Sequence, residues 1–107
     1  MFNTYIHEDV ILIGSSIDLI DNFCKDAISA METASRAESG CHDYTFSLEL
    51  NDPSVLRITE RWDSMDDLNA HFAMPHMAAF QAAMGANPPK SVTATFYEAT
   101  EVDRPGA

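Results

Sequence analysis

The spacing of hydrophobic positions along this chain changes several times, and each change predicts a new element. A short β-branched run over Val10–Gly14 predicts a first strand. Apolar residues then recur every three or four positions, which predicts an amphipathic helix from polar N-cap candidates at 15–18 to Gly40. Residues 1–8 precede this strand either as an extension of it or as an arm.

The next two strands are joined by a short turn. Over Cys41–Leu50 apolar and polar side chains alternate, so that Tyr44 and Phe46 share one face of the strand. The Asn-Asp-Pro-Ser composition of residues 51–54 is typical of a turn, and Val55–Trp62 continues as a third strand. The two strands therefore form a predicted hairpin.

A helix interrupted by proline follows the hairpin. Ser64 is a suitable N-cap residue, and Leu68, His71 and Phe72 follow at helical spacing. Pro75 lacks a backbone N–H and should break the helix, so that a second piece runs over about 76–84. The pattern predicts two helical pieces that meet at Pro75.

The chain ends in a strand over Ser91–Val102 and a frayed tail at 103–107. The order is β-α-β-β-α-β, which predicts an α+β, ferredoxin-like fold: a four-stranded antiparallel sheet with two helices on one face. We expect one domain over residues 1–107, with its core at 10–102. Apolar residues on both faces of the last two strands favour a homodimer that packs sheet against sheet.

Composition narrows the classes of partner. The chain has 107 residues, 46% of them hydrophobic, and a formal charge of −11. This charge argues against nucleic acid and anionic membranes, because both bind cationic patches. There is no signal peptide pattern and no membrane-spanning apolar run. The two cysteines are too few for a disulfide scaffold and lack C-x-x-C spacing. We expect a soluble cytoplasmic protein.

Several motifs give the chain a family resemblance. They are Ala37-Glu38-Ser39-Gly40-Cys41-His42-Asp43-Tyr44, Glu60-Arg61-Trp62-Asp63-Ser64, Leu68-Asn69-Ala70-His71 and Pro75-His76-Met77-Ala78-Ala79-Phe80. In order and spacing the chain resembles the antibiotic biosynthesis monooxygenase (ABM) family, over Val10 to Val102. The resemblance implies a dimeric α+β barrel. Within the family, the motifs look closer to the quinol-monooxygenase-like branch.

The haem-degrading branch of that family fits less well. By the resemblance, His71 stands where that branch has a tryptophan, and Gln81 stands where it has a histidine. Its third marker is an asparagine on the first strand, and Val10–Gly14 contains none. All three positions differ from the marker residues of the haem-degrading branch, which argues against haem degradation.

His71 and His76 are the candidate catalytic residues. A histidine can take a proton from a phenol at neutral pH, and the resulting anion is a better reductant towards oxygen. The resemblance then implies a cofactor-independent monooxygenase that acts on a small phenolic or quinol-like compound. The alternative is that each histidine only caps the helix break at Pro75 or pairs with an acid.

A pocket between sheet and helices would hold such a substrate. Its candidate lining residues are Tyr44, Trp62, Phe72, Met77, Phe80 and Phe96. Aromatic residues at this spacing are also ordinary core residues. Two other functions stay open: a non-redox enzyme of isomerase type or a binding protein with this fold, and a protein whose dimer is its whole function.

Glu60 is the polar residue of an otherwise apolar strand face. It alternates with Ile58 and Trp62, so its burial would require a hydrogen-bonding partner. Arg57 and Arg61 lie on the opposite face of the same strand. We expect Glu60 to make a structural hydrogen bond or a dimer contact.

A metal site is an alternative use of the histidines. His71 and His76 are five positions apart, whereas four places two ligands on one helical face. The break at Pro75 could bring them together, with Glu60 or His42 as a third ligand, but neither has diagnostic spacing.

Sequence signals for other cofactors are weak. Gly14-Ser15-Ser16 lacks the spacing of a dinucleotide-binding loop, and the chain has no evident set of haem ligands. We expect the isolated protein to carry no flavin, haem or stoichiometric metal.

Overall fold

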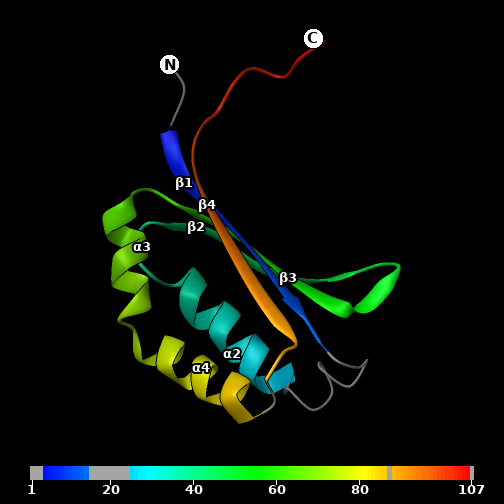
Figure 1. Cartoon of the computed structure of the whole chain (residues 1–107). Coiled ribbons are helices and arrows are strands. Elements are labelled where there is room, and N and C mark those ends of the chain that lie inside the picture. The colour runs from blue at the N-terminus through cyan, green and yellow to red at the C-terminus, as the bar shows by residue number, and fades with distance from the viewer. Residues whose placement is uncertain (1–3, 15–24, 87, 107) are drawn as a thin grey trace.

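The computed structural model describes residues 4–14, 25–86 and 88–106, and shows a sheet with helices on one face (Figure 1). The elements in chain order are β1 Thr4–Ile13, α2 Lys25–Arg36, β2 Cys41–Glu49, β3 Asp52–Trp62, α3 Met65–Phe72, α4 Pro75–Ala86 and β4 Ser91–Thr100.

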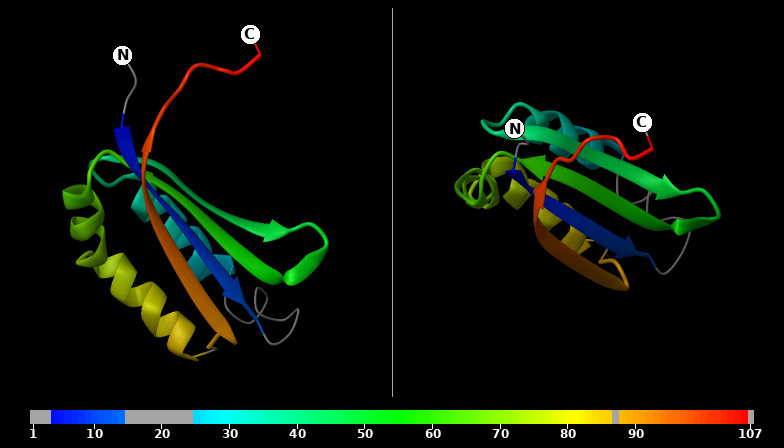
Figure 2. Two further views of the ribbon diagram at one scale, coloured as in Figure 1. Left: turned by 45° about the horizontal axis from the view of Figure 1, so that its top comes forward. Right: turned by 90° about the horizontal axis from the view of Figure 1, so that it is seen from above.

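The sheet has four strands in the order β2-β3-β1-β4, and every neighbouring pair is antiparallel. Figure 2 shows the strands side by side with the helices behind them. This order, with β1 and β3 in the centre, confirms the predicted ferredoxin-like arrangement.

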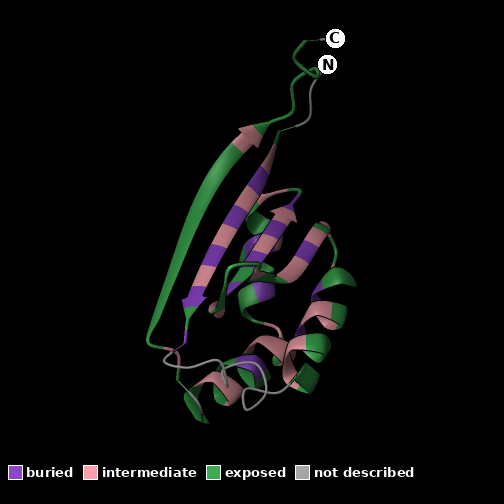
Figure 3. Ribbon diagram, turned by 90° about the vertical axis from the view of Figure 1, so that its right-hand side faces the viewer, coloured by how far each residue is buried: buried purple, intermediate pink, exposed green. Residues whose placement is uncertain are grey.

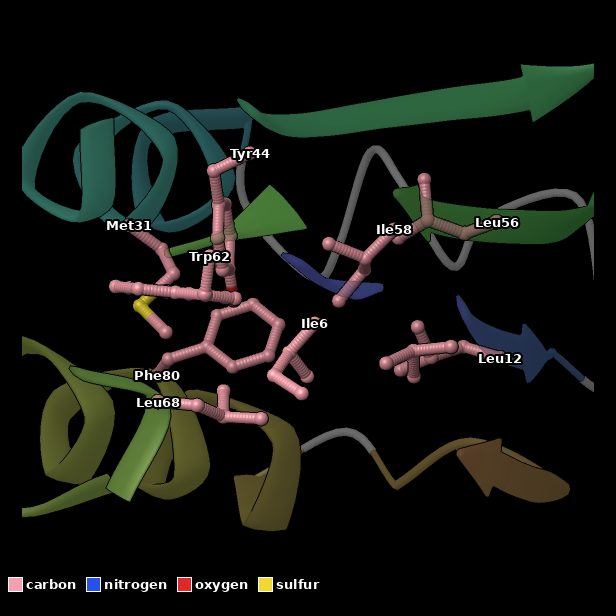
Figure 4. Close-up of a cluster of buried hydrophobic side chains, with 10 residues drawn as sticks. Ile6, Leu12, Met31, Tyr44, Leu56, Ile58, Trp62, Leu68 and Phe80 are labelled. Atoms are coloured by element: carbon pink, nitrogen blue, oxygen red, sulfur yellow. The ribbon is translucent and has the colours of Figure 1, made fainter. Parts of the chain in front are cut away.

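The hydrophobic core lies between the sheet and the helices. In the register of β1 and β3, Ile6 pairs with Trp62 and Leu12 pairs with Leu56, so these side chains share one face. Figure 4 shows how the sheet residues meet side chains from the helices. The buried cluster consists of Ile6, Val10, Leu12, Met31, Tyr44, Leu56, Ile58, Trp62, Leu68 and Phe80.

The other face of the sheet carries a mixed set of side chains. On β3 only Val55 is apolar and buried there, whereas Arg57 is exposed and Thr59 is half-buried. The expected apolar patterning of this second face is therefore weaker than predicted for β3. At the sheet edge, β4 is exposed at nine of its ten positions (Figure 3).

Some element boundaries differ from the predicted ones. Strand β1 begins at Thr4 rather than at residue 10, because Ile6 and Glu8 continue the buried alternation and pair with β3. The start of the predicted first helix, at 15–24, lies outside the described residues.

Gly40 does not close the first helix. Helix α2 ends at Arg36, and Gly40 lies in the turn that follows, with φ of 80°. It has this conformation at a close approach to α3, since a Cβ there would overlap the carboxyl group of Asp67.

Candidate active site

Three side chains from separate segments meet beside the sheet. Glu38 lies in the turn between α2 and β2, His71 in the last turn of α3, and His76 at the start of α4. The Nδ1 atom of His71 lies 2.6 Å from Oε2 of Glu38, and Nε2 of His76 lies 2.7 Å from the same oxygen. We call these residues the Glu38 cluster.

The helix break places the two histidines together. Ser64 caps α3 by accepting from the backbone N–H of Asp67, and α3 ends at Phe72. Helix α4 then starts at Pro75, where the missing N–H costs nothing because a first-turn N–H has no intrahelical partner. The rings of His71 and His76 end 5.9 Å apart, which a continuous helix would not produce at this spacing.

Assigning Glu38 as a carboxylate sets the tautomers of the two histidines in the Glu38 cluster. An ionised carboxylate only accepts, so both imidazoles must donate to Oε2 of Glu38. His71 then carries its proton on Nδ1, and its Nε2 has a free lone pair. Among the described residues, Nε2 of His71 and Oε1 of Glu38 are both buried without a hydrogen-bond partner.

The surroundings of His71 keep it neutral. Its side chain is fully buried, with ring centroids of Trp62 at 4.9 Å and Tyr44 at 5.3 Å. Burial lowers the pKa of His71, and the hydrogen bond to Glu38 opposes this shift. A neutral imidazole held by a carboxylate, with one free nitrogen, is the arrangement of a general base.

A buried pair of carboxyl groups lies on strands β1 and β3. Glu8 of β1 pairs in register with Glu60 of β3, and both residues are buried. The indole N–H of Trp62 donates to Oε1 of Glu60 over 3.0 Å, and the two carboxyl groups share a hydrogen bond. Burial, and then the charge of Glu8, raise the pKa of Glu60 to about 9, so the pair retains a proton at neutral pH.

Tyr44 connects these two groups electrostatically. Burial, followed by the charges of Glu60 and Glu8, raises the pKa of Tyr44 far above its ordinary value. Its hydroxyl therefore stays protonated and can act as a hydrogen-bond donor.

The predicted pocket residues lie in different surroundings. Tyr44 and Trp62 are fully buried beside His71, and Phe72 is 45% exposed with its ring 5.7 Å from that of His71. Phe80 belongs to the buried core and Met77 packs against it. Phe96 lies on β4 opposite Glu8, half-exposed at the sheet edge.

Sequence reasoning missed two acidic residues of this region. Glu38 stands 33 and 38 positions from its histidine partners, a separation at which no local pattern predicts contact. The sequence did contain a signal for Glu8, because Glu8 is the only charged residue among the alternating positions that it shares with Ile6 and Val10.

The other polar candidates lie outside the Glu38 cluster. His42 is exposed and forms a hydrogen bond with Asp63, and it does not belong to the cluster that contains His71 and His76. Arg61 bonds to Glu101 on the surface, as expected for a side chain facing away from Glu60. Burial, and then the charge of Glu38, raise the pKa of Cys41 to about 11, which does not favour a nucleophilic thiolate.

Within the described residues, the Glu38 cluster is the one group with donor atoms arranged for a metal ion. One atom each from Glu38, His71 and His76 lies within 4.8 Å of the others. Glu60 and His42, the third ligands considered from the sequence, do not belong to it. No helix in the described ranges is long and apolar enough to cross a bilayer.

Comparison with known proteins adds a family. Residues 24–83 match the family model described as antibiotic biosynthesis monooxygenase. No match was found among curated protein sequences.

Several solved structures share the fold. A Deinococcus radiodurans protein, provisionally named an antibiotic biosynthesis monooxygenase, is 25% identical with a TM-score of 0.80, covering 92% of this chain and 96% of that one. A protein from Mycobacterium tuberculosis is 22% identical with a TM-score of 0.79, covering 94% and 99%. A Caulobacter crescentus protein with the same provisional name is 20% identical with a TM-score of 0.76, covering 94% of each chain.

Proposed function

Because the chain belongs to the antibiotic biosynthesis monooxygenase family, whose model matches more than half of it, we propose that it oxidises a small phenolic or quinol-like compound with molecular oxygen. No cofactor takes part in this proposal, and the activity resembles that of the quinol-monooxygenase-like branch. In the overall reaction, one oxygen atom replaces two hydrogen atoms of the substrate, and the other oxygen atom leaves as water.

One observation carries the proposal. His71 is a fully buried imidazole that Glu38 holds at Nδ1, and its Nε2 has no partner among the described residues. Nε2 takes the proton of a substrate hydroxyl, and Glu38 stabilises the imidazolium that forms. The substrate anion then donates an electron to oxygen more readily than the neutral phenol does.

The aromatic residues around His71 are suited to a flat substrate. Tyr44 and Trp62 provide ring faces next to the imidazole, and the hydroxyl of Tyr44, which is hydrogen-bonded to Ser35, stays protonated. Phe72 is the half-exposed ring beside His71, so substrate entry requires it to move. Met77, Phe80 and Phe96 complete the proposed lining at greater depth or at the sheet edge.

A second candidate function rests on the Glu8–Glu60 pair. A retained proton near a neutral base is the requirement for moving a proton between two carbon atoms, as an isomerase does. Such an enzyme would convert its substrate without consuming oxygen, so a measurement of oxygen consumption distinguishes the two functions.

We also propose that the working form is a cytoplasmic homodimer. Strand β4 is exposed at nine of ten positions and presents Val92, Phe96 and Tyr97 as half-exposed apolar side chains. A second copy packed on the sheet face away from the helices would cover Tyr97.

Oxygen uptake with a panel of hydroquinones, in the presence of a chelator and without flavin, tests the main proposal. His71→Ala and His76→Ala should each lower turnover on the order of a hundredfold or more. His42→Ala is the matched control, because its imidazole is exposed and pairs with Asp63. Full activity in both cluster variants would overturn the role of the histidines.

A further inference from the structure

We propose that Glu38, His71 and His76 bind a divalent transition-metal ion of the zinc type. The three donor atoms, one carboxylate oxygen and two imidazole nitrogens, already lie within 4.8 Å of one another. Two histidines and one carboxylate are a common ligand set for zinc, with a fourth position left for water. Imidazole ligands exclude magnesium and calcium as the preferred ions, since both favour oxygen donors.

The ion would take the place of the two N–H···O hydrogen bonds that now link the side chains, and each neutral imidazole would keep its one proton on its other ring nitrogen. The N–H groups of His71 and His76 donate to one oxygen of Glu38 over 2.6 and 2.7 Å. Metal–ligand bonds of about 2.0–2.2 Å at tetrahedral angles separate the donors by about 3.3 Å. Each imidazole nitrogen therefore needs to move away from the Glu38 oxygen by less than about 1 Å, and the two nitrogens, which lie within 4.8 Å of one another, need to reach the same separation. Rotation of His76 in its partly exposed position can provide this adjustment.

The charge of the cluster favours a cation. The side chain of Glu38 is 6% exposed, and its only ion-pair partners in the described part of the chain are these two histidines. Its Oε1 atom is buried without a partner. Burial of a carboxylate requires compensating positive charge or hydrogen bonds, and a divalent ion supplies that charge.

Metal binding has a consequence for the proposed function, and this step rests on that function. A metal bound to Nδ1 of His71 requires the ring proton to lie on Nε2, since a neutral imidazole carries one N–H proton. The free lone pair then disappears, and the base cannot accept a proton from substrate. Zinc should therefore inhibit the oxygenase.

Zinc binding to chelator-treated protein, measured by titration calorimetry, tests the site without using activity. We expect about one ion per chain at micromolar or tighter affinity, and at least a tenfold loss of affinity in Glu38→Gln and in His76→Ala. Glutamine keeps the shape of Glu38 but is a poor zinc ligand. His42→Ala should bind zinc like the wild type, because His42 lies outside the cluster.

The outcomes separate the two proposals. Absence of saturable binding, or equal affinity in the Glu38→Gln and wild-type proteins, overturns the metal site; circular dichroism establishes that each variant is folded. One zinc per chain, together with no turnover of any hydroquinone by the metal-free protein, supports the metal site and contradicts the proposed function. Turnover that saturating zinc leaves unchanged contradicts the tautomer step.

Discussion

At the scale of single residues, Glu60 keeps a proton that most glutamates lose well below neutral pH. Its pKa is raised from 4.5 to about 9, first by burial and then by the charge of Glu8. The folded state thus binds this proton more tightly than the unfolded state. The resulting contribution to stability is complete below about pH 4.5 and is lost as the pH rises towards about 9.

Glu60→Gln should remove much of that dependence. Glutamine keeps an oxygen for the Trp62 indole N–H and does not titrate. We expect the melting temperature of the wild type to fall more than that of the variant between about pH 5 and about pH 8.5. Glu49→Gln, at an exposed carboxylate, is the control. Parallel curves for Glu60→Gln and wild type would contradict a shared proton.

The sequence could predict only part of the site at this scale. His71 and His76 were expected to border one region, because the break at Pro75 and the apolar stripe are local signals. Glu38 forms its contacts across more than thirty positions, and such contacts depend on the tertiary fold. Their geometry decides whether a histidine is a cap, a base or a ligand, so that choice was open before the structure.

At the scale of elements, Gly40 sets the distance between the β2 turn and α3. An alanine there would adopt φ of 80° at a steric cost and would displace Asp67, which accepts from the Ser64 cap hydroxyl. We expect Gly40→Ala to lower the free energy of unfolding by about 2 kcal/mol or more.

The matched control is a glycine inside a helix. Gly85 lies in α4, and a Cβ there meets nothing within 4 Å. Gly85→Ala should therefore stabilise the protein by up to about 1 kcal/mol. Urea unfolding of both variants checks the pair, and equal effects would contradict the contact assigned to Gly40.

The elements themselves followed well from local patterns. Alternation predicted β2 and β3, and proline chemistry predicted the separation of α3 from α4. The length of strand β1 was underestimated because the charged Glu8 interrupts its apolar alternation. The partner of that charge lies on β3, beyond the range of any local pattern.

At the scale of the whole molecule, the edge strand β4 carries apolar side chains that a single chain does not bury. Light scattering at micromolar concentration should give about twice the 11.8 kDa mass of one chain. Tyr97 projects from the sheet face away from the helices, so Tyr97→Glu should weaken the dimer by placing a charge on that face. A monomeric wild type would contradict the proposed assembly.

The contact between Trp62 and His71 makes the molecule its own optical probe. Trp62 is the single tryptophan of the chain, is fully buried, and lies with its ring 4.9 Å from the His71 imidazole. Its fluorescence should be blue-shifted, and a protonated imidazole at that distance should quench it. Emission intensity would therefore report the state of His71 directly, in a protein that needs no label and no known substrate.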